Sequence, residues 1–191
     1  MSANRTSEIH RYRVIGLVPG SNGCVSKLGN PYTLIFWNSL YRLPYVVLDD
    51  GDFPDEFLLQ TNDLLVVMTD LKWDAPILGS AGFIPEDNRF LHNQRLGKLI
   101  NWDKSLLHPK FVYHLFNAEY VRGQIKASAT GSTVRHTSPK RIYEVKVYLP
   151  AVHVQKQIAS ELDDKLAGVK LAEASIQQEM DTIGAMPAAL L

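Results

Sequence analysis

The sequence contains a single cysteine, Cys24, and no apolar run that approaches the roughly 20 residues of a membrane-spanning helix. One cysteine excludes an internal disulfide and any zinc site built from several cysteines. Residues 1–13 are polar and offer no apolar segment to a signal peptidase. With 46% hydrophobic and 21% charged residues, the composition is that of a globular domain. We therefore expect a cytoplasmic protein that makes no use of a membrane.

The motifs of several enzyme classes are also missing. Neither G-x-G-x-x-G nor G-x-x-x-x-G-K-S/T occurs, and H-E-x-x-H is absent. The six histidines are scattered, so we expect structural or surface roles for them and no metal site. Glu144-Val145-Lys146 resembles the acidic-x-Lys pair that holds Mg²⁺ in many nucleases. About one such triplet is expected by chance in a chain of this composition, so a Mg²⁺-dependent nuclease remains an alternative and no catalytic residue is assigned.

Charge is balanced over the whole chain but not along it. Lys plus Arg and Asp plus Glu each number 20, for a net charge of zero. Residues 111–150 hold six basic and two acidic side chains, whereas residues 151–191 hold three basic and six acidic ones. A basic segment beside an acidic one indicates that one face meets an anion. Ordinary variation of surface charge is the alternative.

The pattern of apolar residues predicts an α+β fold in two parts. Residues 1–150 are predicted to form one mixed domain, in which residues 63–69, a continuous apolar run, form a strand buried on both faces. A bulky stripe from Phe111 to Tyr120 predicts a helix that begins at Pro109 and runs to about residue 125. Further strands are predicted at residues 11–18, 32–37, 45–48, 96–102 and 141–149.

Residues 151–191 differ in character and are predicted to form one long helix, from about residue 152 to 183. Apolar side chains recur there every seven residues, which keeps one seam facing a partner helix, as in a coiled coil. Such a rod would be about 45 Å long, more than a small domain can cover. A helix folded back on its own domain is the alternative. The predicted partner-facing residues are Ile158, Leu162, Val169, Ile176 and Ile183.

Three polar segments are candidates for binding an anion or a nucleic acid. The first, residues 126–136, is small and hydroxyl-rich, as suits a loop that follows phosphates; a plain connector is the alternative. Its candidate residues are Lys126, Ser128, Thr130, Gly131, Ser132, Thr133, Arg135 and His136.

The second candidate segment carries Asn93, Gln94 and Arg95, side chains suited to the edges of adenine and guanine. The alternative is that Asn93 and Gln94 satisfy backbone groups where a strand begins. Lys72 and Trp73, which follow the strongest predicted strand, form the third candidate.

Four segments together resemble the specificity subunits of type I restriction–modification systems. Residues 63–70, Asp-Leu-Leu-Val-Val-Met-Thr-Asp, are similar to a strand motif of that family, and residues 93–97, Asn-Gln-Arg-Leu-Gly, to a second motif. Residues 125–136 and the Leu149-Pro150 pair with Gln155 and Ile158 resemble two more, in the family's order and spacing. The chain departs from the pattern at Val154, where the family usually has Glu.

The resemblance implies a function as well as a fold. The first part would be a target recognition domain that reads one half of a bipartite sequence in double-stranded DNA, and the long helix would be a spacer and dimerisation arm. The chain would be non-catalytic and hold no cofactor. S-adenosylmethionine, ATP and Mg²⁺ would belong to the methyltransferase and restriction subunits with which it assembles. Its relatives usually have two domains and two helices, so we expect a half-subunit that forms a homodimer, or a piece of a longer subunit. An assembly or regulatory protein that uses only the helix is a further alternative.

Overall fold

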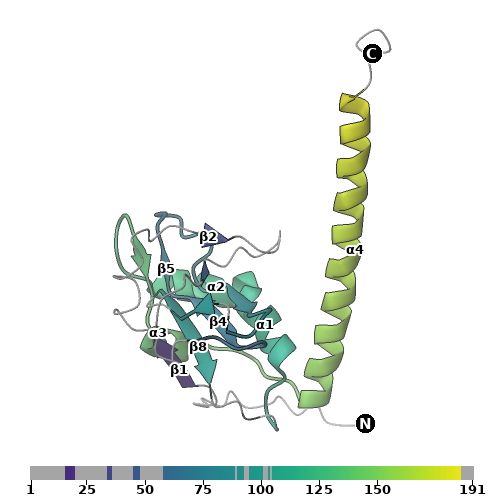
Figure 1. The fold of residues 1–191 in the computed structure, drawn as a ribbon. Coiled ribbons are helices and arrows are strands. Elements are labelled where there is room, and N and C mark those ends of the chain that lie inside the picture. Colours follow the sequence, from purple (N-terminus) through teal and green to yellow (C-terminus); the bar gives the residue numbers. More distant parts are fainter. Residues whose placement is uncertain are drawn as a thin grey trace.

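A computed structural model describes residues 58–88, 90–92, 95–100, 103 and 105–185, together with three short strands nearer the N-terminus (Figure 1). The statements below concern these residues. In chain order the elements are β1 (Gly16–Pro19), β2 (Leu34–Ile35), β3 (Tyr45–Val47), β4 (Leu64–Val67), β5 (Thr69–Asp70), β6 (Ala81–Phe83), β7 (Phe90–Leu91), β8 (Leu96–Ile100), α1 (Pro109–Asn117), α2 (Glu119–Ser128), β9 (Arg135–His136), α3 (Pro139–Tyr143) and α4 (Val152–Gly184). The α+β class predicted from the sequence is confirmed.

Strand β4 lies at the centre of the domain. It belongs to a four-stranded antiparallel sheet of order β1-β8-β4-β6, and smaller sheets are formed by β2-β3-β7 and by β5-β9. Leu64 and Val66 pack into a core with α1 and α2, whereas Leu65 and Val67 pack into a second core with Leu96 and other residues on the opposite face. The prediction of a strand buried on both faces is therefore confirmed, although it ends at Val67 and β5 follows Met68.

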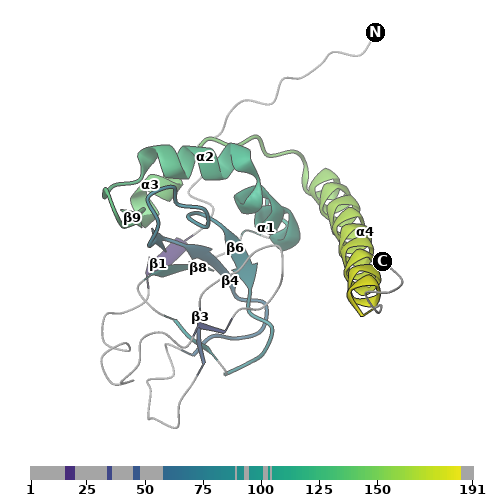
Figure 2. The same ribbon diagram turned by 90° about the horizontal axis from the view of Figure 1, so that it is seen from above.

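Helices α1 and α2 cover one face of the main sheet, and β3 lies on the other side (Figure 2). The prediction of one continuous helix from Pro109 to about residue 125 is wrong, because Ala118 is extended at φ −74° and ψ 138°. The side-chain amide of Asn117 pairs with the backbone N–H and C=O of Ala81 at 3.1 and 3.0 Å. This pairing fixes the end of α1 on β6, and the bend turns Val121 and Ile125 back into the same core.

The strand predicted at residues 141–149 is also wrong. Pro139 and the N-cap Ser138, whose hydroxyl accepts from the Arg141 N–H at 3.4 Å, begin the short helix α3 instead. The segment that follows has no strand beside it. The side chain of Gln124 accepts from the Lys146 N–H and donates to the Lys146 carbonyl, both at 3.0 Å, and so takes the place of a strand neighbour.

The remaining strand predictions are partly tested. Strand β8 ends at Ile100, and residues 101 and 102 of the predicted strand lie outside the described residues. Near the N-terminus, β1, β2 and β3 fall on or overlap the three predicted strands, whose other residues are likewise outside the described part. In the part of the chain that the structure describes, no helix is long and apolar enough to cross a membrane.

The long helix predicted near the C-terminus is confirmed as α4. Its first turns pack against α1, and its second half continues past the domain (Figure 1). Gln155 is fully buried: its amide oxygen accepts from the His108 N–H at 2.9 Å, and its amide nitrogen donates to the carbonyls of Leu106 and Pro150 at 2.8 Å each. A buried amide with both ends satisfied fixes the start of the helix on the domain.

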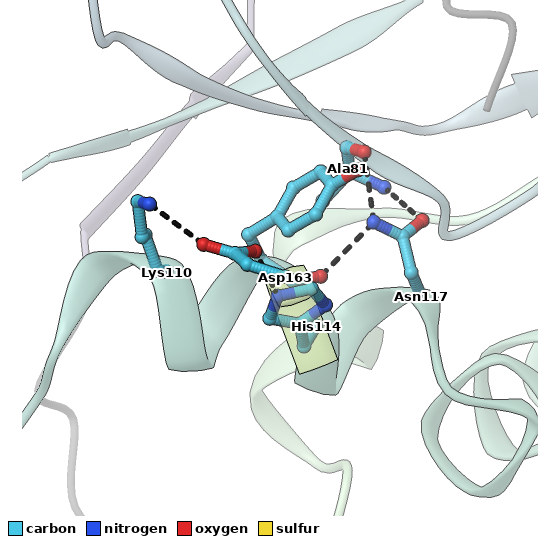
Figure 3. A network of polar contacts seen from close by, with 6 residues as sticks. Ala81, Lys110, His114, Asn117 and Asp163 are labelled. Atoms are coloured by element: carbon cyan, nitrogen blue, oxygen red, sulfur yellow. Dashed lines mark hydrogen bonds and ion pairs between the residues drawn. The ribbon is translucent and has the colours of Figure 1, made fainter. Parts of the chain in front are cut away.

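A second polar contact fastens α4 two turns further along. Lys110 and His114, one turn apart on α1, both reach the carboxylate of Asp163, at 2.6 and 2.8 Å (Figure 3). Burial favours the neutral form of Asp163, but the hydrogen bonds from Lys110 and His114 outweigh it and lower the pKa of the carboxyl. Between Gln155 and Asp163 the helix therefore has a fixed direction relative to the domain.

Candidate nucleic-acid interface

Strands β4 and β5 bring two of the three candidate segments together at Met68. The Met68 N–H donates to the carbonyl of Arg95 at 2.8 Å, and the Met68 carbonyl accepts from the Thr137 N–H at 2.9 Å. The Met68 N–H thus contacts the second segment, and the Met68 carbonyl contacts the residue directly after the first segment. Because the backbone of Met68 bonds to both, the two segments have a fixed separation.

Residues 130–136 form a tight hairpin, which we call the 130–136 hairpin. Thr130 and His136 exchange two backbone hydrogen bonds, of 2.9 and 2.8 Å. Gly131 has a φ of +95°, and a Cβ atom there would lie 1.9 Å from the carbonyl oxygen of Val134. Only glycine fits this turn. Ser132 and Thr133 are exposed at its tip, so the hydroxyls that the sequence singled out are presented to solvent.

The Arg135 side chain stabilises this hairpin through hydrogen bonds to backbone carbonyls. Its guanidinium donates to the carbonyl oxygens of Gly131 and Lys126, at 3.1 and 3.0 Å, and the side chain is half-buried. The sequence suggested Arg135 as a source of positive charge for an anion. The structure shows a guanidinium already bonded to two backbone carbonyls, which closes the loop against the end of α2.

The other two candidate residues at this end of α2, Lys126 and Ser128, both make contacts within the helix. The Lys126 ammonium lies 3.9 Å from a carboxylate oxygen of Glu119, at the start of the same helix, and the lysine side chain is largely covered. The Ser128 side chain donates to the Ile125 carbonyl at 3.0 Å, so its hydroxyl proton is used in the last helical turn.

The far side of the hairpin is attached to the sheet. His136 pairs with Thr69 between β9 and β5, and the His136 Nδ1 atom lies 3.0 Å from the Thr69 hydroxyl. Asp70, the next residue of β5, is buried, and its two carboxylate oxygens accept from the N–H groups of Lys72 and Ile77 at 3.0 and 2.8 Å. Thr69 and Asp70 belong to the strand motif of the family resemblance, but they were not among the candidate site residues. The signal for them was two polar residues at the end of an apolar run.

Asn93 and Gln94 lie outside the described residues, but the loop that carries them is defined at both ends. His92 is buried, and its Nε2 atom donates to the Leu96 carbonyl at 3.1 Å. Burial lowers the pKa of His92 and outweighs the opposing effect of this hydrogen bond, so the ring is neutral at pH 7. The exposed Arg95 lies within the loop so closed. A structural role for His92, as the sequence indicated, is confirmed.

The described residues contain no group of three His, Cys, Asp or Glu side chains placed to hold a metal ion. Glu144, the acidic residue of the nuclease-like triplet, is exposed and lies in the irregular segment after α3 rather than on a strand. The triplet therefore lacks the strand that the sequence predicted for it.

The predicted seam of α4 is largely open to solvent. Ile158 is half-buried near the domain, but from Leu162 onward the repeating positions are exposed, and every described residue from 171 to 185 is exposed. The alternative of a helix folded back on its own domain is wrong for this part of α4. The exposed seam residues are Leu162, Val169, Ile176 and Ile183.

Comparison with known proteins identifies the family. A family model described as "Type I restriction modification DNA specificity domain" matches residues 30–180. No curated protein matches the chain.

Solved structures with a similar fold come from the same kind of system. One, titled "Structural basis underlying complex assembly and conformational transition of the type I R-M system", has a TM-score of 0.56 and 19% identity, covering 89% of this chain and 41% of that one. Specificity subunits from M. genitalium (TM-score 0.46, 20% identity, 65% and 33% covered) and Thermoanaerobacter tengcongensis (TM-score 0.45, 16% identity, 69% and 34% covered) are also similar.

The chain spans between 33% and 41% of the length of these structures. The family match extends over most of the sequence and takes in the mixed domain from residue 30 onward and nearly all of α4. The chain therefore belongs to the type I restriction–modification DNA specificity domain family, whose members are non-catalytic specificity subunits built from a target recognition domain and a long helix.

Proposed function

We propose that this chain recognises one half of a bipartite sequence in double-stranded DNA, with residues 1–150 as the recognition domain and residues 151–191 as the arm. The observation that carries the proposal is the convergence at Met68 and β5 of the 130–136 hairpin, the loop closed by His92 and the turn that begins at Lys72. Three separate chain segments that meet on a rigid sheet are suited to contacting several adjacent nucleotides.

The residues of this interface divide by role. Lys72 is exposed and Lys126 lies at the edge of the hairpin, so both are proposed to contact phosphates. Asn93, Gln94 and Arg95, with the hydroxyls of Thr130, Ser132 and Thr133, are proposed to contact bases or sugar-phosphate oxygens. The Ser128 hydroxyl, whose proton is bonded to the Ile125 carbonyl, is proposed only to accept a hydrogen bond from a base. Gly131, Arg135 and His136 are proposed to keep the hairpin in shape rather than to supply charge. His136 is also exposed, so its ring adds a donor at the surface.

The distribution of charge supports placing the DNA on the domain rather than on the arm. Residues 111–150, which include the hairpin, carry a net charge of +4, and residues 151–191 carry −3. A phosphate backbone is attracted to the first and repelled by the second, so the duplex lies against the domain rather than along the arm.

The arm is proposed to pair with the same helix of a second copy through Ile158, Leu162, Val169, Ile176 and Ile183. Exposed apolar side chains at seven-residue intervals are typical of a helix that packs against another helix. A homodimer would present two recognition domains to the two halves of one target. Methyltransferase subunits, and through them a restriction subunit, are proposed as further partners that supply S-adenosylmethionine, ATP and Mg²⁺ chemistry.

The salt dependence of DNA binding tests the proposal. Log affinity for duplex DNA should fall linearly with log salt, and each phosphate contact should contribute about 0.9 to the slope. Lys72→Ala with Lys126→Ala should reduce the slope by nearly two, whereas Lys165→Ala, an exposed lysine on α4, should leave it unchanged. Equal slopes for all variants would remove both lysines from the DNA face.

Mapping of methylated bases tests the division into halves. Cells that express this chain with its cognate methyltransferase subunit should carry methylated adenine within a symmetric, bipartite motif. If a peptide of residues 151–191 reproduces the effect of the whole chain, the helix-only alternative is correct and the recognition domain is not needed.

A further inference from the structure

Two large apolar side chains are exposed directly beside the 130–136 hairpin. Leu71 is 55% exposed and Trp73 is 78% exposed, in the turn that follows β5. We call residues 71–77 the Trp73 loop. Because β5 pairs with β9, this loop and the hairpin begin from the same two-stranded ladder. Exposed apolar groups at a defined surface position are typical of an interaction site.

The Trp73 loop is held firmly at its base. The buried carboxylate of Asp70 accepts from the N–H groups of Lys72 and Ile77, and the Arg122 guanidinium on α2 donates to the Pro76 carbonyl. Ala75 is buried in the main core and has a φ of +48°, a conformation that non-glycine residues rarely adopt. A strained backbone that the surrounding structure maintains is typical of functional loops.

The chemistry of the loop favours a base stack as its partner. Lys72 lies between the two apolar residues, and the exposed Asp74 offsets its charge, so the tip as a whole is nearly neutral. The adjacent hairpin belongs to the segment with a net charge of +4. An indole and an aliphatic side chain beside a cationic surface match the arrangement in which apolar residues pack on or between bases while lysines hold the phosphates.

We propose that Trp73 and Leu71 form a wedge that packs against a base step at the edge of the recognised half-site and bends the duplex there. The inference rests on the proposed function, because it assumes that DNA occupies the face that carries the hairpin. It assigns to the Trp73 loop a sequence-dependent role that needs no hydrogen bond, since base steps differ in the cost of unstacking them.

The experiment uses the full chain and a probe selected by it. A random-sequence duplex library is enriched on the wild-type protein, and the enriched duplex, labelled at both ends, reports affinity by anisotropy and bending by energy transfer. Trp73→Ala should weaken binding roughly tenfold, the effect of losing one base–aromatic stack, and should reduce the bend. The slope of log affinity against log salt should stay as in the wild type, because no charge is removed. Trp73→Phe should restore most of both effects.

Tyr148→Ala is the matched control. Tyr148 is an aromatic residue of similar exposure, 68%, in the segment between α3 and α4. That segment runs from α3 to the start of α4, away from β5 (Figure 1). The Tyr148→Ala variant should bind and bend the probe as the wild type does. Since Trp73 and Tyr148 are both mostly exposed, neither change should lower the melting temperature appreciably.

The outcomes separate the two proposals. If the wild-type chain enriches no duplex and shows no salt-dependent binding, the proposed function itself fails. If the wild type binds and Trp73→Ala binds and bends the probe equally well, DNA recognition stands and the wedge is wrong. The wedge is also wrong if Trp73→Ala leaves DNA binding intact but abolishes binding to a methyltransferase subunit, because the loop would then be a protein contact.

Discussion

The Thr69 hydroxyl and the His136 Nδ1 atom lie 3.0 Å apart, although 67 positions separate the two residues in the sequence. This contact connects β5, which follows the central strand β4, with the hairpin proposed to bind DNA. We expect Thr69→Val to lower the free energy of unfolding by about 1 kcal/mol, the net contribution of one hydrogen bond. DNA affinity should fall with it, because the hairpin loses a side-chain support. Thermal unfolding and anisotropy measure the two effects.

Gly131 should be intolerant of any side chain. Gly131→Ala places a Cβ atom against the Val134 carbonyl at a φ of +95°, so the turn must change shape, at a cost of about 1–3 kcal/mol. Gly168→Ala is the control, because a Cβ atom there meets nothing within 4 Å. In the helix it should stabilise the protein by up to about 1 kcal/mol. Equal DNA binding by wild type and Gly131→Ala would contradict the proposed role of the hairpin.

Gln155 should contribute more to stability than any other glutamine on α4. Gln155→Ala leaves the His108 N–H and two carbonyl oxygens without their partner in a buried site, and we expect a loss of about 2–4 kcal/mol in the free energy of unfolding. Gln177→Ala removes only an exposed contact to Asp181 on the same helix and should cost less than about 0.5 kcal/mol. Urea unfolding of the two variants gives the comparison.

Asp163 should make stability depend on pH in the acid range. Its folded-state pKa is lowered below the ordinary value of 3.8, so its contribution is present above that value and is lost as the pH falls through the lowered one. Asp163→Asn should therefore unfold more easily than the wild type at pH 7, by up to about 1 kcal/mol. The two proteins should converge as the pH falls below the lowered pKa of Asp163. A constant difference at every pH would mean that the carboxylate charge is not responsible.

A charge placed on the seam of α4 should prevent self-association. Ile176→Glu puts a carboxylate at a repeating position that is 57% exposed in one chain, and we expect it to make the proposed homodimer monomeric. Leu171→Glu, at a position 72% exposed and outside the seven-residue repeat, should leave it dimeric. Sedimentation equilibrium distinguishes the two. If wild type and both variants are monomers, the homodimer is wrong.

Patterns that depend on neighbouring residues predicted the structure well. The seven-residue repeat identified α4 nearly to its ends, and the uninterrupted apolar run identified β4, whose two faces pack into separate cores. The alternation at residues 141–149 predicted a strand, and Val145, Val147 and Leu149 do pack against the core. In the part of the chain that the structure describes, no strand pairs with them. The Gln124 side chain bonds to the Lys146 backbone instead, and no local sequence pattern predicts this contact.

The candidate interface shows the same limit. The composition of residues 126–136 predicted a hydroxyl-rich loop, but residues 126–128 form the end of α2 and residues 135–136 form β9. Between them the structure places the exposed Ser132 and Thr133 at the tip of the hairpin. The contacts that hold the hairpin could not be predicted from sequence. Thr69 and Asp70 are distant in sequence, and the sequence suggests Arg135 as a source of charge rather than as a donor to backbone carbonyls. From sequence alone, an arginine whose guanidinium donates to backbone carbonyls of other residues looks the same as one whose guanidinium binds an anion.

The fastening of α4 at Gln155 and Asp163 has a mechanical consequence. Twenty-one residues, from Asp164 to Gly184, extend beyond the second contact, a length of about 30 Å at 1.5 Å per residue. A tilt of roughly 10° at the fastening would swing the tip by about 5 Å, more than the 3.4 Å rise between successive base pairs. The spacing between a partner bound at the far end of α4 and the nucleotides read by the domain therefore depends on a few polar groups: Lys110 and His114 on α1, and the backbone of Leu106, His108 and Pro150 around Gln155.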